Sequence, residues 1–525
     1  MAHAIIFTDR VPRTWSFGNV NYAGSYLTPG AGAYKIASVV REMGLTAIVV
    51  PNCLNLTLQG IKQIIDQNSQ GLLWVGMSTT FLGTKINKTT LQKYREIWAS
   101  SPDQTLDVGI LFEQVKSFIP STEVVWGATE LKSISDYIKP LNASVLIGGP
   151  WANILVNHID DNTFAVEGTG EEFTKQFTYN KLSDHTSTTK PFGNVTYDDV
   201  GFKSSTIRWE QSDLIDKDMW LPVEVARGCA FSCAYCSYTR KNNVDSFKNP
   251  KVLRDELIRN YEMFGVTKFI VLDDLYNDSK EKVRVLYDEV WSKLPFKPEW
   301  ASYMRLDMFW ADKESADIIL ASGAKIGSFG IETLHDIAGK KVGKGLGRKR
   351  TIETLQMLKE KWNNDILIHS FFIAGLPNEP RESLEETIEW LKTTNLIDAY
   401  QWTPLWITPE SHKSFVKDMN MISINNNKYG VSWLSDTNWI NDMGITFEEA
   451  TDIAKRAMET QMDGASVSFG GYADLRLSGF THQEILQRKI DPLFDKKLID
   501  QTQRLTERIS ARTKHVLNLR DHVTH

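Results

Sequence analysis

The sequence predicts an α/β fold in two parts, each built on a parallel sheet. Short apolar runs alternate with amphipathic helical patterns twice along the 525 residues, and such alternation is typical of parallel sheets covered by helices. A polar stretch rich in Ser, Thr, Asn and Asp follows the first part and indicates a linker. After the second part the alternation weakens, and two capping boxes predict a mostly helical end. We therefore expect domains at 1–181 and 220–425, a linker at 182–219 and a helical C-terminal region at 426–525.

The first part is predicted to be a doubly wound, Rossmann-like sheet. Its candidate strands are short and mostly apolar: Ala4–Phe7, Ala47–Val50, Leu72–Met77, Ser144–Ile147 and Phe164–Val166. Small residues follow the last three of these runs, and ligands of such sheets bind at the carboxyl ends of the strands. Glycine at this edge lets a bulky ligand approach the backbone. The candidate ligand-binding residues are Ser78, Thr79, Gly148, Gly149 and Gly168.

Six further strand candidates alternate with helices in the second part. They are Pro222–Ala226, Lys268–Leu272, Trp300–Met304, Ile326–Phe329, Leu367–Ala374 and Ala399–Pro404. Polar side chains follow these strands closely, as expected where an α/β barrel builds its active site. Each carboxylate there could instead cap a helix or occupy its first turn. These carboxylates are Asp273, Asp274 and Glu332, and Arg305 is the cation among the polar residues that follow the strands.

Three of the four cysteines lie in one short loop after the first of these strands. Cys229, Cys233 and Cys236 have the spacing C-x3-C-x2-C. Three thiolates can hold three irons of a four-iron cluster and leave the fourth iron open to a small molecule. A structural zinc site needs four ligands, usually in two pairs, and the sequence has no second cysteine pair. Cys53 follows an apolar run and is expected to be a small buried residue.

These motifs resemble those of the radical S-adenosylmethionine (SAM) superfamily. Besides the cysteine loop, the similar segments are Val271–Asp274, Arg305–Asp307, Gly330–Thr333 and Phe372–Pro377. The resemblance implies a partial (βα)6 barrel, a four-iron four-sulfur cluster on the three cysteines and reductive cleavage of SAM to a 5′-deoxyadenosyl radical. It also implies an electron donor such as flavodoxin or ferredoxin. The residues implied to contact SAM are Tyr235, Asp273, Asp274, Arg305, Glu332 and Gly375.

The glycine turns of residues 1–180 are similar to those of the cobalamin-binding domain that precedes many radical SAM barrels. The motif D-x-H-x-x-G is absent, because Asp9-Arg10-Val11-Pro12-Arg13 follows the first strand, so that motif supplies no histidine below cobalt. The resemblance implies cobalamin-dependent methylation of an unactivated carbon. Two alternatives stay open: a cobalamin-independent cyclase or rearrangement enzyme, and a non-catalytic sensor of SAM or cobalamin. The sequence assigns no catalytic side chain.

Composition limits the partners. A net charge of −6 argues against nucleic acid as the main partner. No apolar run approaches the roughly 20 residues that cross a bilayer, and the start does not resemble a signal peptide, so we expect a cytoplasmic protein. No motif distinguishes a small-molecule substrate from a peptide. The basic segment 340–350 is interpreted either as a solvated loop or as a clamp for a phosphate or carboxylate. The tryptophans at 402, 406, 433 and 439 either seal the barrel or line its cavity.

Overall fold

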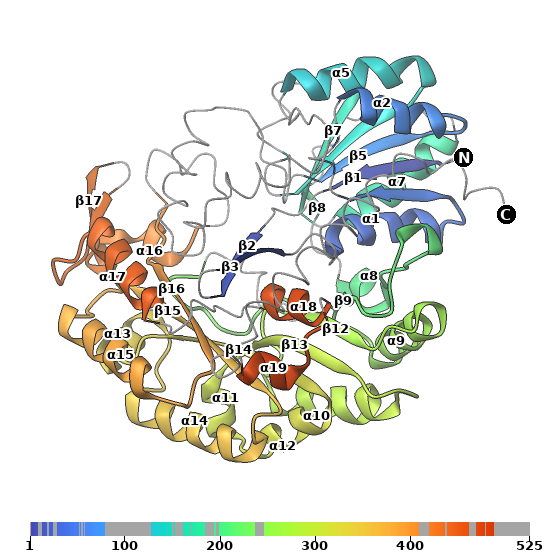
Figure 1. Cartoon of the computed structure of the whole chain (residues 1–525). Helices are drawn as coiled ribbons and strands as arrows, with labels where there is room; N and C mark the ends of the chain where they lie inside the picture. The colour runs from blue at the N-terminus through green and yellow to red at the C-terminus, as the bar shows by residue number, and fades with distance from the viewer. Residues whose placement is uncertain are drawn as a thin grey trace.

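Two parallel sheets form the protein, as predicted (Figure 1). Each has six strands, which is one more than predicted for the N-terminal sheet. The computed structural model describes residues 2–8, 13–17, 20–24, 29–51, 53, 56, 58–78, 128–149, 152, 161–168, 170–183, 194–195, 199–236, 246–408, 419–435, 438–460, 469–477 and 479–487. Within these ranges no helix is long and apolar enough to cross a membrane.

The N-terminal sheet has the strand order β4-β1-β5-β6-β7-β8. These strands are β4 (Ala47–Val50), β1 (Ala4–Phe7), β5 (Trp74–Ser78), β6 (Ser144–Gly148), β7 (Thr163–Gly168) and β8 (Asn194–Val195). The chain order reverses between β1 and β5, which defines a doubly wound sheet and places its ligand edge at the carboxyl ends of the strands.

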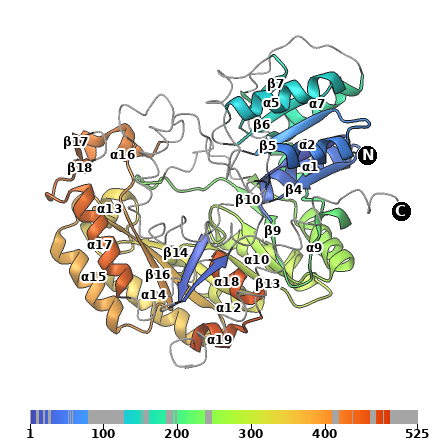
Figure 2. The same ribbon diagram turned by 45° about the horizontal axis from the view of Figure 1, so that its top comes forward.

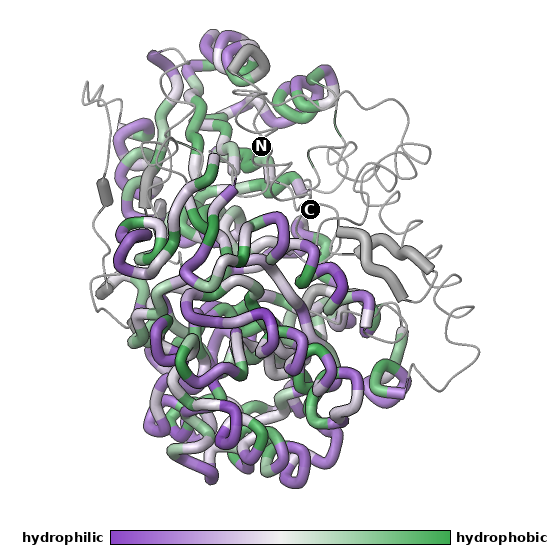
Figure 3. The backbone as a smooth tube through the Cα atoms, turned by 90° about the vertical axis from the view of Figure 1, so that its left-hand side faces the viewer, coloured by the Kyte–Doolittle hydropathy of each residue, from purple (hydrophilic) through white to green (hydrophobic). Residues whose placement is uncertain are grey.

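Helices cover both faces of this sheet. Alternate residues of a strand point to opposite faces, and Ala4 and Ile6 accordingly belong to one apolar cluster while Ile5 and Phe7 belong to another. The first cluster includes residues of α1 (Ala31–Glu42), and apolar residues of α7 (Gly170–Leu182) pack against it. The second cluster includes residues of α2 (Leu58–Gln67) and α5 (Ala128–Ile138). Hydrophobic residues follow the strands, and polar ones the outer helix faces (Figure 3).

The second sheet runs through six strands in chain order and stays open between its first and last strand. The strands are β9 (Trp220–Glu224), β12 (Lys268–Leu272), β13 (Glu299–Met304), β14 (Ala324–Glu332), β15 (Leu367–Ala374) and β16 (Ala399–Pro404). All neighbours pair in parallel. This is the partial (βα)6 barrel that the sequence predicted.

Helices follow the strands on the outside of this barrel. They are α9 (Pro250–Phe264), α10 (Lys280–Glu289) with the short η4 (Trp291–Lys293), α12 (Glu314–Ala321), α14 (Arg348–Trp362) and α15 (Arg381–Thr393). The end of α9 is set by Gly265, whose φ of +69° suits glycine and closes the helix. Two short helices were not predicted: α11 (Leu306–Ala311) and α13 (Asp336–Val342).

The C-terminal region is helical in part. It includes the helices α17 (Phe447–Glu459), α18 (Phe469–Leu477) and α19 (His482–Gln487). Thr446 and Thr481 cap α17 and α19 as predicted, since each side-chain oxygen accepts from the backbone N–H three residues later. Sequence reasoning missed α16 (Met421–Ile424), η6 (Asn426–Tyr429) and the hairpin of β17 (Ser432–Ser435) and β18 (Asn438–Ile440). Residues 488–525 lie outside the described part.

Helices α18 and α19 close the floor of the barrel. Their apolar residues pack with Trp220, Ile270, Ala301, Ile326, Leu367 and Ala399, which come from the beginnings of the six strands. Trp220 meets Tyr472 edge to face at 5.5 Å. A hairpin of β2 (Arg13–Phe17) and β3 (Val20–Gly24) crosses from the N-terminal part toward the barrel, where β3 contacts α18 (Figure 2).

The stretch predicted as a linker contains structure. Besides β8, it holds α8 (Asp199–Ser204) and the short η3 (Gln211–Asp213). Trp209 is fully buried, and Arg41 of α1 forms a two-pronged ion pair with the buried Asp213. Ile207 and Trp209 of this segment belong to the apolar cluster that also includes residues of α1 and β9.

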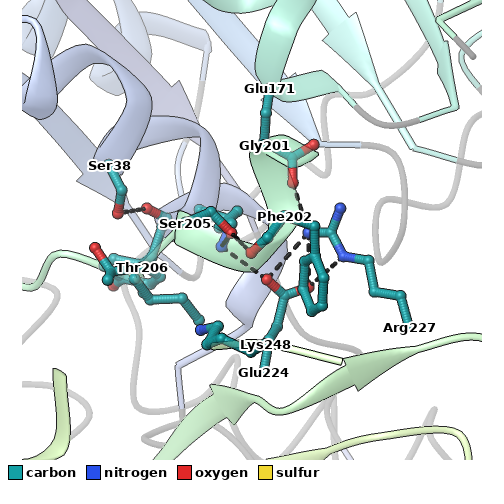
Figure 4. Close-up of polar contacts among 12 residues, drawn as sticks. Ser38, Glu171, Gly201, Phe202, Ser205, Thr206, Glu224, Arg227 and Lys248 are labelled. Carbon is teal, nitrogen blue, oxygen red and sulfur yellow. Dashed lines mark hydrogen bonds and ion pairs between the residues drawn. The ribbon is translucent and has the colours of Figure 1, made fainter. Parts of the chain in front are cut away.

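A polar network joins the two sheets at their carboxyl ends (Figure 4). Glu224, the last residue of β9, pairs with Lys35 of α1 at 2.9 Å and with Arg227 at 2.8 Å. Arg227 also reaches Glu171 in the first turn of α7 at 2.5 Å. Burial alone would raise the pKa of Glu224, but Lys35, Arg227 and Lys248 together outweigh it and hold that pKa at about 2. The network therefore stays ionised. It connects β9 of the barrel with α1 and α7 of the N-terminal part.

Gly375 follows β15 and lies against an aromatic ring. Its φ is +87°, and a Cβ at this position would come within 2.5 Å of Trp439 and 3.1 Å of Ala450. Trp439 and Trp402 are both buried, at 1% exposure, which agrees with a packing role for these two tryptophans. The SAM contact implied for Gly375 stays a prediction, and close packing by itself requires glycine here.

Replacing Gly375 by alanine should destabilise the protein by about 2–4 kcal/mol, because overpacking adds to backbone strain. Gly444→Ala is the matched control, since Gly444 has a φ of +76° but no atom within 4 Å of a new Cβ. That variant should lose only about 1 kcal/mol. Denaturant unfolding measures both, and equal losses would contradict the packing explanation.

Candidate functional site

The cysteine loop leaves the barrel at the carboxyl end of β9. It lies between β10 (Ala226–Arg227) and β11 (Ser246–Phe247), which pair antiparallel at its base. Two backbone hydrogen bonds fix its middle: Ala234 donates to Val342 O at 2.9 Å, and Ile422 donates to Ala234 O at 3.1 Å. The loop is therefore held between the end of α13 and α16.

The donor chemistry of this loop fits an iron–sulfur cluster. None of the three thiols forms a disulfide, and none is fully buried. Among the described residues, however, no group of three or more His, Cys, Asp or Glu side chains is close enough together to hold a metal ion. The support for a cluster therefore comes from the presence of three soft sulfur donors in one loop at the mouth of the barrel. The distances between the sulfur atoms do not add to it.

Arg305 packs directly on the cysteine loop. Its guanidinium lies 3.8 Å from the ring centre of Phe231, and Nη1 lies 3.4 Å from Sγ of Cys233. Asp307 accepts two hydrogen bonds from the same guanidinium, at 2.8 and 2.6 Å. The Asn277 side chain donates to the backbone oxygen of Arg305 and accepts from its backbone N–H. Burial alone would raise the pKa of Asp307, but Arg305 lowers it, so both partners stay charged.

Tyr235 and Glu332 meet on the other side of the loop. The Tyr235 hydroxyl donates to Oε1 of Glu332 at 2.9 Å, and Lys344 lies 3.8 Å from the same oxygen. Burial raises the pKa of Glu332 against the opposing charge of Lys344. Glu332 has a φ of +68°, which is rare for a residue with a side chain and marks a strained position.

The two adjacent aspartates after β12 have different surroundings. Asp274 accepts a hydrogen bond at 3.0 Å from the backbone N–H of Gly228, the residue before Cys229. Asp273 is buried, pairs with Lys282 at 2.8 Å and accepts from the backbone of Leu275. Only Asp274 is thus brought to the cysteine loop. A SAM contact by Asp273 stays a prediction without geometric support.

The glycine residues of the N-terminal sheet lie together at its carboxyl edge. Ser78 ends β5 and pairs in register with Gly148, which ends β6, while Gly168 ends β7. A Cβ at Gly148 would meet no atom of the described residues within 4 Å, so this position itself leaves room for a ligand. Gly149 follows with a φ of +105°. Thr79 lies outside the described residues.

The concave face of the barrel carries a polar row that sequence reasoning missed. Tyr303, Ser328 and His369 stand side by side on β13, β14 and β15, two residues beyond the floor residues of the same strands. A 3.0 Å hydrogen bond joins Ser328 to Nδ1 of His369, whose Nε2 has no partner among the described residues. Burial lowers the pKa of His369 to about 3, so it is neutral. Tyr303 is 42% exposed.

A buried hydrogen bond supports the strained turn at Glu332. Thr333 donates to Oε1 of Glu379 at 2.5 Å and accepts from the backbone of His335. Glu379 is 1% exposed, and its other oxygen has no partner in the described structure. Burial raises the pKa of Glu379 to about 8, against the weaker lowering effect of Thr333. In the sequence, the only signal for Glu379 was its position four residues after Gly375.

The family comparison agrees with this geometry. Residues 223–391 match the model of the radical SAM superfamily. This range begins inside β9 and includes the cysteine loop and the next four strands. The chain therefore contains a radical SAM domain, which implies a four-iron four-sulfur cluster and SAM.

Curated relatives are distant and longer than the matched region. The chain is 24% identical over 315 residues to the anaerobic magnesium-protoporphyrin IX monomethyl ester cyclase of Cereibacter sphaeroides, covering 55% of this chain and 51% of that protein. It is 27% identical over 195 residues to an uncharacterized methyltransferase of Pyrococcus horikoshii, covering 34% and 38%. The chain thus spans about half, or less, of these relatives.

Solved structures share the fold along nearly the whole chain. The radical SAM methyltransferase TsrM of Kitasatospora setae, with cobalamin and a [4Fe-4S] cluster bound, has a TM-score of 0.54 at 13% identity and covers 99% of both chains. The cobalamin-dependent SAM radical enzyme OxsB has a TM-score of 0.51 at 14% identity, covering 97% of this chain and 72% of its own. The likeness includes the N-terminal sheet and shows the fold.

Glu379 should make stability depend on pH. Its pKa is about 8 in the folded chain and 4.5 as a free side chain, so the folded state keeps a proton that the unfolded state releases. This contribution is present below pH 4.5 and is lost as pH rises through 8, by up to about 5 kcal/mol. Glu379→Gln should therefore raise the melting temperature at pH 8 more than at pH 5.5. The exposed Glu382→Gln is the control, and identical shifts for both variants would contradict the assignment.

Proposed function

We propose that this protein is a cobalamin-dependent radical SAM methyltransferase that acts on an unactivated carbon. The proposal combines the radical SAM domain with the open glycine edge of the N-terminal sheet. Each part binds at the carboxyl ends of its strands. A function that needs both cofactors requires these two edges to be close to each other.

The contact of Arg227 carries the proposal. This side chain stands two residues before Cys229 and pairs with Glu171, which comes three residues after Gly168. One guanidinium thus links the base of the cysteine loop to the glycine edge. This link supports two cofactor edges that lie close together, which methyl transfer between cofactor and substrate needs.

The roles of the chain's own residues follow from this arrangement. When bound, the cluster supplies the electron that cleaves SAM, and cobalamin supplies the methyl group. Cys229, Cys233 and Cys236 would hold the cluster, while Arg305 keeps a positive charge beside Cys233. Tyr235, Asp274 and Glu332 surround the space next to the cysteines and would orient SAM.

The substrate would bind on the concave face. Tyr303 is exposed there, whereas the neutral His369 and Ser328 beside it are buried and would support the binding surface from below. These groups suit an uncharged or weakly polar region of a substrate. Helices α18 and α19 close the floor below them, so the substrate would enter from the side of the cofactors.

A cyclisation reaction is the second candidate, because a cyclase is among the curated relatives. Both reactions start with the same reductive cleavage of SAM. They differ in the fate of the substrate radical, since methylation adds a carbon to the substrate and cyclisation does not. The mass of the product therefore separates the two candidates.

Changing Cys229, Cys233 and Cys236 together to alanine should remove nearly all of the iron. Anaerobic reconstitution of the unchanged protein should give about four irons per chain, measured by colorimetric iron analysis. Cys53→Ala is the matched control, because Cys53 is buried in the N-terminal core and should keep the full iron content. Iron retained by the triple variant would rule out the cluster assignment.

Gly148→Trp should abolish cobalamin binding and leave the iron content unchanged. The indole would occupy the open space above β6 and weaken binding about a hundredfold or more, a steric cost of about 3 kcal/mol. Gly32→Trp is the control, since Gly32 lies on the exposed side of α1 and also has no atom near a new Cβ. Absorbance of bound cobalamin reads the result. Normal binding by the Gly148 variant would show that the pocket is elsewhere.

A further inference from the structure

The back of the cysteine loop carries a basic surface that the proposed chemistry does not use. It consists of Ile337, Lys340 and Lys341 on α13, and Ile424 and Lys428 from α16 and η6. We call it the lysine face. Ile337 is 62% exposed and Ile424 47% exposed, and the three lysines are exposed as well. Figures 1 and 2 both show α13 and α16 on the same side of the barrel.

The lysine face forms one continuous surface. Nζ of Lys341 donates to the backbone oxygen of Lys428 at 3.2 Å, and both amino groups lie within 6.0 Å of the Tyr429 ring centre. None of its three lysines forms an ion pair with an acidic residue that the structure describes, unlike Lys344 and Arg348 in the next loop. This surface is locally positive although the chain has a net charge of −6.

The same elements touch the cysteine loop directly. Val342 and Gly343 end α13, and Gly343 is exposed while its backbone oxygen lies 3.8 Å from Sγ of Cys233. Ile422 of α16 binds Ala234 in the loop. One layer of backbone therefore separates the lysine face from a cysteine that would ligate iron. Electron transfer becomes much slower with distance, so a donor docked here would be at a favourable position.

We propose that the lysine face is the docking surface for an acidic, one-electron carrier protein of the flavodoxin type. This rests on the proposed function, because reductive cleavage of SAM needs an electron. One electron passes from the reduced flavin to the cluster, so the flavin is oxidised and the cluster reduced by one electron each. No bond breaks in this step. Two exposed isoleucines within a basic surface suit a small, transient redox interface.

Charge reversal tests the surface by binding alone. In Lys340→Glu/Lys341→Glu/Lys428→Glu, the dissociation constant of oxidised, flavin-loaded flavodoxin should rise about tenfold or more at low salt. Calorimetric titration measures it, and added salt should weaken binding to the unchanged protein. The matched control changes Lys280, Lys293 and Lys297 to glutamate. These lysines are exposed in and beside α10, and the net charge changes by the same amount. The three lysine-to-arginine changes on the lysine face should keep binding.

Two reductants separate this proposal from the proposed function. With reduced flavodoxin, the lysine-face variant should need about tenfold more donor for half-maximal formation of 5′-deoxyadenosine. With dithionite, which needs no docking surface, its rate should equal that of the unchanged protein. Equal flavodoxin dependence in the lysine-face and control variants would overturn the docking surface. No 5′-deoxyadenosine from the unchanged protein with dithionite would instead overturn the proposed function.

Discussion

The arrangement of the two sheets depends on one guanidinium, that of Arg227. Its donors are divided between Glu224 at the end of one sheet and Glu171 beside the end of the other. Arginine suits this position because its planar group serves two carboxylates at once and never loses its charge. Because Glu224 also pairs with Lys35, loss of Arg227 would leave that carboxylate with one cation in place of two. Charge and direction thus act together with the apolar cluster that runs from the N-terminal sheet to the barrel.

Three buried glutamates show how strongly the surroundings set ionisation in this fold. Glu224 has two cations in contact, and its pKa falls to about 2. Glu332 has a tyrosine hydroxyl and a more distant Lys344, which do not offset burial, so its pKa is raised. Glu379 has only a threonine hydroxyl, and its pKa reaches about 8. The carboxylate that joins the sheets is therefore permanently charged, while the one that supports the strained turn remains protonated at neutral pH.

Much of the fold could be predicted from sequence, because apolar runs of strand length are local signals. The bounds of Ala4–Phe7, Lys268–Leu272 and Leu367–Ala374 agree with those of the strands. The cysteine loop was recognisable for the same reason, since all its ligands lie close together in the chain. Asp273 and Asp274 could not be distinguished, because adjacent residues of one type differ only in the direction of their side chains. The pairing of Ser328 with His369 was equally hidden, since it depends on strand register across 41 residues.

The floor of the barrel has a consequence for biosynthesis. Trp220 opens the first barrel strand, but Tyr472, the ring that covers it, is made about 250 residues later. During translation all six strands leave the ribosome before the segment that seals their inner face. A ribosome-bound chain therefore exposes a continuous apolar surface from Trp220 to Ala399, which is the kind of surface that chaperones bind. Truncation just before α18 would retain every proposed cofactor ligand and yet leave a protein prone to aggregation.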